Sequence, residues 1–294
     1  MKGPNSTPSM ATGMLVMASS SVLFSAMSIL IPLTRSVNTS IVVSARFVTG
    51  IAVILGMAGL GIVRLKAVNR WWLLVRGIIG ASSVYFFYRG ITTLGLGKGT
   101  VLNYTYPVFA ALLAPLVVKE KFSWDVLAAA LVSFLGILLV VSPGGGVSFS
   151  SIGVEDLLAL LGGVLSGVAV VAIKKLRETD SPHIIYLAQC VFGMLVVGWP
   201  TITGSFAFPP IQWVILLGIG VLATAAQLAM TWAYKHVPAT TGSLLAFLVP
   251  VLNVLLGVAV FGELMHLSTL VGSVVVLLCC GYVAFREKIL KLFG

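Results

Sequence analysis

The chain has 294 residues, of which 59% are apolar and only 9% are charged, and its mean hydropathy is +1.12. A soluble domain carries about 25% charged residues, so these values exclude a soluble fold and indicate an integral membrane protein. The formal net charge of +10 does not indicate nucleic acid, because the basic residues gather at the ends of apolar stretches. The expected surroundings are the lipid bilayer.

Ten apolar stretches follow one another along the chain, and each is long enough to span a bilayer. A spanning helix needs about 20 predominantly apolar residues. Backbone groups in hydrocarbon must be paired within the protein, which favours helices here. The sequence therefore predicts an all-α integral membrane protein with ten transmembrane helices. They are expected at residues 10–33, 38–62, 71–93, 97–118, 123–142, 152–173, 182–202, 211–234, 239–261 and 266–285.

Basic residues concentrate in every second connection between these helices. The connection before the third helix holds Arg64, Lys66 and Arg70, and Arg76 is grouped with them. An excess of Lys and Arg in short connections marks the cytoplasmic face. We therefore expect a multi-pass protein of the cell (inner) membrane with both termini in the cytoplasm and no removable signal peptide.

The second helix carries Arg46 about seven residues from its outer end, roughly 10 Å deep at 1.5 Å per residue. A charge inside a spanning helix costs at least about 2.5–3.5 kcal/mol and is functional by default. We expect Arg46 to bind a carboxylate or phosphate in the transport path. The alternative is a structural pair with Glu155 or Asp156 at the outer start of the sixth helix.

The third helix has Tyr85, Tyr88 and Arg89 at positions i, i+3 and i+4, which lie on one face. We expect these side chains at the solute site. The alternatives are an aromatic belt at the membrane interface for the tyrosines and, for Arg89, a side chain that snorkels to the outer surface.

The fourth helix begins with the stretch GKGTVLNYTYP at residues 97–107. Gly99, Asn103 and Tyr106 fall on one face, and Pro107 beside them removes a backbone hydrogen bond. A polar face weakened by proline is tolerated where it lines a wet cavity. We expect Asn103 and Tyr106 to bind solute, and Gly99 and Pro107 to form a helix break or gate. The alternative is that Asn103 bonds across a helix interface.

The eighth helix places Gln227 and Thr231 on one face, and both are expected to bind solute. The ninth helix offers a counterpart of the fourth: Asn253 as a binding residue, with Gly242 and Pro250 at the break or gate. Packing by small residues is the alternative for this face.

Two further motifs are interpreted as structural. Gly163 and Gly167 form a GxxxG motif on the sixth helix, which predicts close approach of a neighbouring helix. Glu120 and Glu263 precede the fifth and tenth helices, and we expect them to stabilise the N-termini of those helices electrostatically.

An internal repeat relates the two halves of the chain. A constant offset of 143 residues between residues 99–120 and 242–263 aligns Gly99 with Gly242, Pro107 with Pro250 and Glu120 with Glu263. These segments are the fourth and ninth helices, and the odd separation of five helices inverts the second copy. The sequence predicts two inverted five-helix repeats with a solute site near mid-membrane between them.

These features resemble the drug/metabolite transporter superfamily, of the EamA type, over essentially the whole chain. The resemblance includes the proline-to-glutamate endings PVFAALLAPLVVKE and PVLNVLLGVAVFGE and the ARF at 45–47. It implies that helices three, four, eight and nine surround a cavity, that one and six gate it, and that five and ten meet at the pseudo-symmetry interface. The expected parts are a cytoplasmic tail (1–9), a first EamA-like repeat (10–142), an external linker (143–151), a second repeat (152–286) and a basic cytoplasmic tail (287–294).

The expected function is secondary transport of a small polar organic metabolite by alternating access. Cations, amides and phenols suit a carboxylate-bearing metabolite such as an amino acid or derivative, and the resemblance implies export. The alternative is a phosphate- or nucleotide-linked metabolite, and the different classes are a membrane-embedded enzyme or a non-transporting scaffold. No catalytic residue, metal site or cofactor is predicted, because His, Cys and Asp are not grouped. The expected state is a monomer or homodimer.

Overall fold

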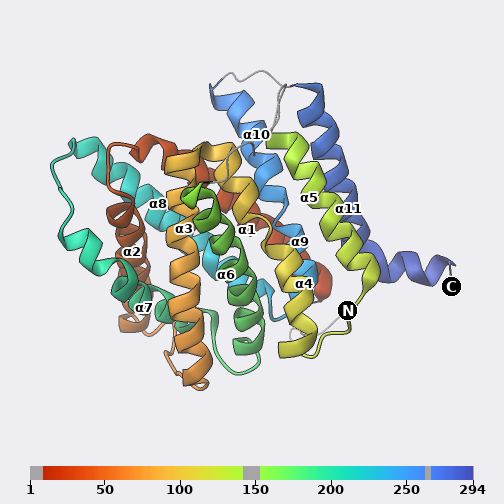
Figure 1. Cartoon of the computed structure of the whole chain (residues 1–294). Coiled ribbons are helices and arrows are strands. Elements are labelled where there is room, and N and C mark those ends of the chain that lie inside the picture. The colour runs from red at the N-terminus through yellow and green to blue at the C-terminus, as the bar shows by residue number, and fades with distance from the viewer. Residues whose placement is uncertain (1–8, 142–152, 262–265, 294) are drawn as a thin grey trace.

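The computed structural model describes residues 9–141, 153–261 and 266–293, and within these ranges it consists of helices without a strand (Figure 1). The all-α prediction is confirmed. The expected linker at 143–151 and Glu263 lie outside the described residues. The helices are α1 (Met10–Leu30), η1 (Ile31–Thr34), α2 (Thr39–Gly59), α3 (Arg70–Asn103), α4 (Tyr106–Val117), α5 (Trp124–Val141), α6 (Val154–Leu176), α7 (Pro182–Ile202), α8 (Pro210–Ala233), α9 (Ala239–Leu245), α10 (Leu248–Phe261) and α11 (Leu267–Phe293).

The helices correspond to the ten predicted stretches. Five described segments are long and apolar enough to cross a membrane: Met10–Thr34, Thr39–Gly59, Val154–Leu176, Pro182–Ile202 and Pro210–Ala233. Shorter apolar helices occupy Tyr106–Val117, Trp124–Leu139, Ala239–Asn253 and Leu270–Val283. The long helix α3 supplies the remaining stretch, which completes the ten transmembrane helices.

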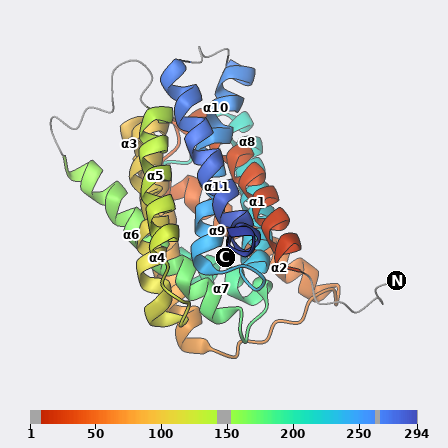
Figure 2. The same cartoon turned by 90° about the vertical axis from the view of Figure 1, so that its right-hand side faces the viewer.

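The helices pack around a pseudo-twofold axis. The first and third helices of one half are α1 and α3, and those of the other half are α6 and α8. Helix α1 packs against α8 and α3 packs against α6, as twofold symmetry requires. Helices α5 and α11, which are equivalent in the two halves, lie side by side in both Figure 1 and Figure 2. The fold is therefore two inverted five-helix repeats, as the constant offset in the sequence predicts.

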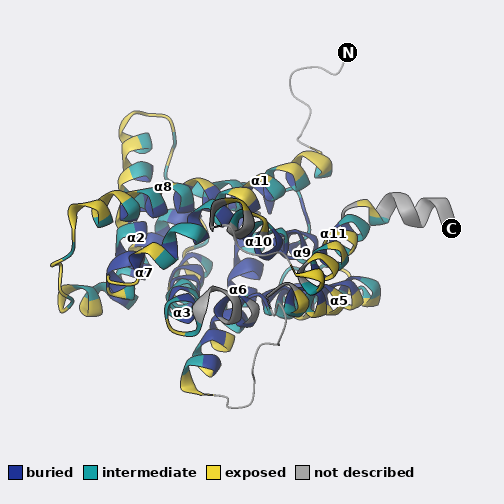
Figure 3. Ribbon diagram, turned by 90° about the horizontal axis from the view of Figure 1, so that it is seen from above, coloured by how far each residue is buried: buried dark blue, intermediate teal, exposed yellow. Residues whose placement is uncertain are grey.

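The outer surface of the bundle is covered by large apolar side chains. Leu116, Trp124, Leu195 and Trp199 are each at least 75% exposed, whereas buried residues gather between the helices (Figure 3). Exposed apolar surface on this scale is unusual for a protein in water. Lipid is the solvent that matches it.

The chain reverses direction inside α3. A Cβ placed on Gly99 would lie 2.5 Å from the carbonyl carbon of Gly90, nine residues earlier, so the two backbones nearly touch. Such a close approach requires glycine, because any side chain would occupy the gap. The predicted boundary between residues 93 and 97 is therefore a tight reversal within one helical run.

The helix break lies further along, directly before Pro107. Helix α3 ends at Asn103 and α4 begins at Tyr106, with proline at its second position. Pro107 has no N–H to donate to the carbonyl of Asn103. The hydroxyl of Thr105 donates to the neighbouring carbonyl of Leu102 at 2.8 Å, so a side chain bonds one of the carbonyl groups at the break.

The second half breaks at the equivalent place. Helix α9 ends at Leu245 and α10 begins at Leu248, two residues before Pro250. A Cβ on Gly242 would lie 2.5 Å from the ring of Tyr234, so this glycine packs closely as well. Each half therefore carries a tightly packed glycine followed by a helix break and a proline.

The GxxxG motif packs against the break in the first half. A Cβ on Gly163 would lie 2.8 Å from the carbonyl oxygen of Leu102, and one on Gly167 would lie 3.1 Å from that of Tyr106. The close helix approach predicted for this motif is confirmed, and it places α6 directly against the ends of α3 and α4.

Glu120 has hydrogen-bond partners that the sequence did not predict. Its carboxylate accepts hydrogen bonds from the backbone N–H groups of Ala239 at 2.6 Å and Thr240 at 3.4 Å. These groups form the N-terminus of α9 in the other repeat, and the hydroxyl of Thr240 donates as well. Glu120 therefore links the two halves, because the first N–H groups of a helix have no partner within the helix and can bond to a carboxylate from another part of the chain.

Candidate functional site

A cavity of about 120 Å³ lies among helices of both repeats. A buried water needs about 10–15 Å³, so the space accommodates several waters or a small organic molecule. It is lined by Met17, Ser20, Ser21, Phe24, Met27, Arg46, Arg76, Gly80, Ser83, Val84, Phe87, Asn103, Tyr104, Tyr106, Ser166, Ala169, Val170, Ile173, Gln189, Gln227, Met230, Ala246 and Val249. Helices α1 and α6 line this cavity together with the helices that the sequence placed there.

Arg46 on α2 lines the cavity and is only 3% exposed. Its guanidinium donates to the hydroxyl of Tyr88 and to the side-chain oxygen of Gln227, both at 3.4 Å. It also lies 5.8 Å from the centroid of the Tyr88 ring. Hydrogen bonds of this type usually measure about 2.7–3.2 Å. The buried cation is therefore held by two long hydrogen bonds and a cation–π contact.

Arg76 on α3 is a second buried cation in the same cavity, and it is also 3% exposed. It donates to the side-chain oxygen of Gln189 at 2.7 Å. The amide of Gln189 donates in turn to the backbone carbonyl of Gly80 at 3.2 Å. The interpretation of Arg76 as one of the loop cations is wrong, because α3 begins at Arg70 and carries it roughly 9 Å into the bundle. Its position inside the expected stretch 71–93 was the signal that could have identified it.

Gln189 occupies the position in the second repeat that Arg46 occupies in the first. The same offset of 143 residues aligns the sequence ARFVTG, which contains Arg46, with AQCVFG, which contains Gln189. Helices α2 and α7, which carry these residues, pack against each other. The pseudo-symmetric pair is thus one cation and one neutral amide, and both line the cavity.

The broken helix contributes Asn103, Tyr104 and Tyr106 to the cavity wall. The amide nitrogen of Asn103 is buried and has no hydrogen-bond partner among the described residues. The rings of Tyr104 and Tyr106 lie 5.7 Å apart. An unpaired buried donor is expensive, so Asn103 is a group that a bound solute could satisfy.

Other predicted site residues contact the lining residues without lining the cavity themselves. Tyr88 is fully buried and accepts a hydrogen bond from Arg46. Thr231 accepts a hydrogen bond from the Gln227 amide at 3.4 Å. Asn253 is buried, with its side-chain oxygen unpaired within the described part of the chain. Neither Asn253 nor Tyr85 lines the cavity.

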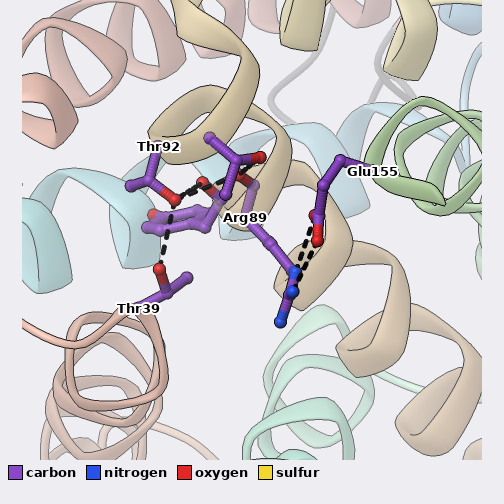
Figure 4. A network of polar contacts seen from close by, with 6 residues as sticks. Thr39, Arg89, Thr92 and Glu155 are labelled. Atoms are coloured by element: carbon purple, nitrogen blue, oxygen red, sulfur yellow. Dashed lines mark hydrogen bonds and ion pairs between the residues drawn. The ribbon is translucent and has the colours of Figure 1, made fainter. Parts of the chain in front are cut away.

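Arg89 lies apart from the cavity in an ion pair with Glu155 (Figure 4). Its Nε and a terminal nitrogen donate to the two carboxylate oxygens at 2.8 Å and 2.6 Å. The side chains are 39% and 32% exposed. Glu155, one of the two carboxylates considered as alternative partners of Arg46, is thus paired with Arg89.

The polar groups of the cavity wall are unbalanced in charge. Arg46 and Arg76 supply two cations, while no Asp or Glu occurs among its lining residues in the described structure. The Nε atoms of both arginines have no hydrogen-bond partner among the described residues. Such a site is suited to an anion, because two buried cations without counter-charges are costly.

The model of the EamA-like transporter family matches residues 11–142 and 153–285. A solved crystal structure superposes with a TM-score of 0.78 at 18% sequence identity, covering 94% of this chain and 97% of that one. At this identity the superposition shows the fold alone.

The curated proteins to which the chain is similar are transporters. It is 28% identical to the pseudopaline exporter CntI of Pseudomonas aeruginosa, over 71% of this chain and 72% of that protein. It is 27% identical to an uncharacterized transporter of Helicobacter pylori, over 74% of each chain. It is 24% identical to a riboflavin transporter of Vibrio cholerae, over 74% of this chain and 72% of that one.

Proposed function

The chain belongs to the EamA-like transporter family, and from this premise we propose that it carries a carboxylate-bearing metabolite across the membrane by alternating access. Transport of a small molecule follows from the family. The carboxylate, the direction and the mechanism are our proposal.

The observation that supports a carboxylate is the environment of Arg46. This cation is buried in a cavity between two inverted repeats and is held by a phenol and an amide. A charge-assisted hydrogen bond to a carboxylate is roughly twice as strong as one between neutral groups. An incoming carboxylate would therefore displace the amide of Gln227 from the guanidinium.

We assign the direction as export, from the cytoplasm. The similarity to the pseudopaline exporter supports this assignment. The basic connections support cytoplasmic termini and insertion in the cell membrane. Because the two repeats are inverted copies, the same cavity would be exposed to either side by exchanging the conformations of the halves.

A phosphate-linked metabolite is the second candidate. The observation that favours it is the presence of a second arginine, Arg76, in the same cavity. Two guanidinium groups match the geometry and the double charge of a phosphate.

The proposal is tested by reconstituting the purified protein alone in liposomes. Labelled acidic and neutral amino acids, simple carboxylates and phosphate esters are loaded inside or outside, and their flux is measured in both directions. We expect flux of carboxylates above that of empty liposomes. Flux of none of the carboxylates, with the protein correctly folded, would contradict the proposal.

Replacing Arg46 by Ala is expected to abolish this flux while the protein still inserts and folds, because the guanidinium is the proposed carboxylate ligand. For each variant, flux is measured in liposomes and the melting temperature is measured on the protein solubilised in detergent. Arg64→Ala removes an exposed cation and is the matched control. An Arg46→Ala protein with normal flux would remove the site proposal.

A further inference from the structure

The cavity contains two cations where the proposed function needs only one. Arg46 and Arg76 lie on different helices, both line the same space, and both are 3% exposed. Removing two like charges from water is costly unless each meets an opposite charge.

The hydrogen-bond partners of both guanidinium groups are replaceable. Arg46 donates to Gln227 at 3.4 Å and Arg76 donates to Gln189 at 2.7 Å. Both acceptors are neutral amides, and both belong to the second repeat, whereas the arginines belong to the first. Carboxylates would form stronger charge-assisted bonds at the same two places.

Part of the cavity wall is apolar. It includes the rings of Phe24 and Phe87, the side chain of Met230 and the aliphatic side chain of Val170. A solute with a short carbon chain and a charged group at each end matches this combination. Apolar walls bury the chain, and polar groups fix the ends.

We propose that the transported metabolite carries two carboxylates, one bound by Arg46 and the other by Arg76. The inference rests on the proposed function and specifies its substrate class as dicarboxylates. Gln227 and Gln189 accept hydrogen bonds from the two guanidinium groups in this structure. A simple amino acid fits less well, because its ammonium group would lie near two cations without a lining Asp or Glu in the described structure.

The test compares probes that differ by one charge. Succinate and glutarate are compared with their monomethyl esters by thermal shift of the purified protein and by competition for flux in liposomes. We expect each dicarboxylate to bind at least about 10-fold more tightly than its ester, the loss expected for one charge-assisted hydrogen bond. Equal binding of diacid and ester would overturn the inference.

Substitutions assign each carboxylate to its arginine. Arg46→Gln and Arg76→Gln are each expected to reduce succinate affinity to about that of its monomethyl ester, and Arg64→Gln is the exposed control. Arg46→Lys and Arg76→Lys keep the charge and should restore part of the affinity. An Arg76→Gln protein that keeps the full preference for succinate would contradict the assignment.

Gln189→Glu provides a variant that retains both arginines. The new carboxylate would neutralise Arg76 from within the protein, so the preference for succinate over its ester should disappear while the ester still binds at Arg46. This result would not be expected if Arg76 merely joined α3 to α7. An unchanged preference in a folded Gln189→Glu protein would overturn the role of Arg76.

The outcomes separate this inference from the proposed function. If diacids and monoesters are carried equally well, carboxylate transport stands and the two-carboxylate substrate does not. If no carboxylate binds or is carried, both fail. A phosphate monoester that binds as tightly as succinate would mean that one doubly charged group serves both arginines, and this too would overturn the inference.

Discussion

Two arginines of the third helix show how strongly the position of a residue decides its role. Arg76 is buried beside a neutral amide, whereas Arg89 forms a half-exposed ion pair with Glu155. Ion pairs with this exposure contribute about 0–1 kcal/mol to stability. A buried cation without a counter-charge is instead a group that an anion would stabilise by binding. Of these two arginines on one helix, Arg89 thus forms a contact near the surface, whereas Arg76 is a candidate for binding the solute.

Gly80 makes the position of Arg76 possible. A Cβ placed on Gly80 would overlap the Nη1 atom of Arg76 and lie 3.5 Å from the amide nitrogen of Gln189. The clash involves the end of a flexible side chain, so the helix would survive and the guanidinium would move.

Gly80→Ala is therefore expected to weaken substrate binding by about 10-fold, the loss of a hydrogen bond to a charged group, without lowering the melting temperature. Flux and thermal shift measure the two effects. Gly56→Ala is the matched control, because a Cβ on Gly56 meets no atom within 4 Å. Normal binding in the Gly80→Ala protein would show that Arg76 need not occupy this position.

At the scale of helices, the break before each proline is held by its neighbours. The GxxxG glycines bring α6 against the carbonyl groups of Leu102 and Tyr106 on either side of the first break. Without a side chain on α6 in the way, the polar residues of the break can lie at the cavity wall. The motif thus packs two elements and positions Asn103.

Gly163→Ala is expected to destabilise the protein by about 1–3 kcal/mol, as overpacking does, because its Cβ would press on the hydroxyl of Thr105 and on the backbone carbonyl oxygens of Leu102 and Asn103. The melting temperature in detergent should fall, and solute affinity should fall with it. Gly198→Ala on α7 is the control, since nothing lies within 4 Å of its Cβ. Equal melting temperatures would show that α6 can move away freely.

At the scale of the whole molecule, the two repeats are joined by contacts on the side expected to face the cytoplasm. Glu120 in the connection between α4 and α5 accepts hydrogen bonds from Ala239 and Thr240 at the start of α9. Within the second repeat, Lys174 of α6 donates to the carbonyl of Val237, just before α9, at 2.8 Å. Opening of the protein on this side would require the hydrogen bonds between Glu120 and the start of α9 to break.

Glu120→Gln is expected to lower stability by about 1–2 kcal/mol, because a negative charge at a helix N-terminus is lost, and to change the rate of flux. The change in stability is measured by thermal melting, and the change in flux is measured in liposomes. Glu178→Gln is the control, because Glu178 is exposed and its ion pair is with Lys175, three residues earlier. Unchanged flux and melting in Glu120→Gln would show that the link does not restrain the two halves.

The expected topology gives a prediction for the whole chain. Green fluorescent protein fused to the C-terminus should fluoresce, and alkaline phosphatase at the same place should be inactive, because basic connections remain in the cytoplasm. Alkaline phosphatase inserted after Gly204, between α7 and α8, should be active. The reverse pattern would invert the proposed direction as well.

The sequence by itself determined the helices, the inverted repeat and the family. Membrane-length apolar stretches leave the backbone few alternatives to helix. A glycine and a proline at the same offset, Gly99 with Gly242 and Pro107 with Pro250, required equivalent packing in both halves. Arg46 could be found because a charge is costly within a spanning segment.

Only the tertiary structure decided which polar groups meet. Gln189 resembles an ordinary buried amide until α7 places it beside Arg76, and Arg89 resembles Arg46 until α6 supplies Glu155. Glu120 precedes α5 in the chain but binds α9. Propensity and hydropathy are properties of one segment, whereas the electrostatic energy of a buried group depends on neighbours that are distant in the chain. The pairing of charges is therefore set when the helices pack.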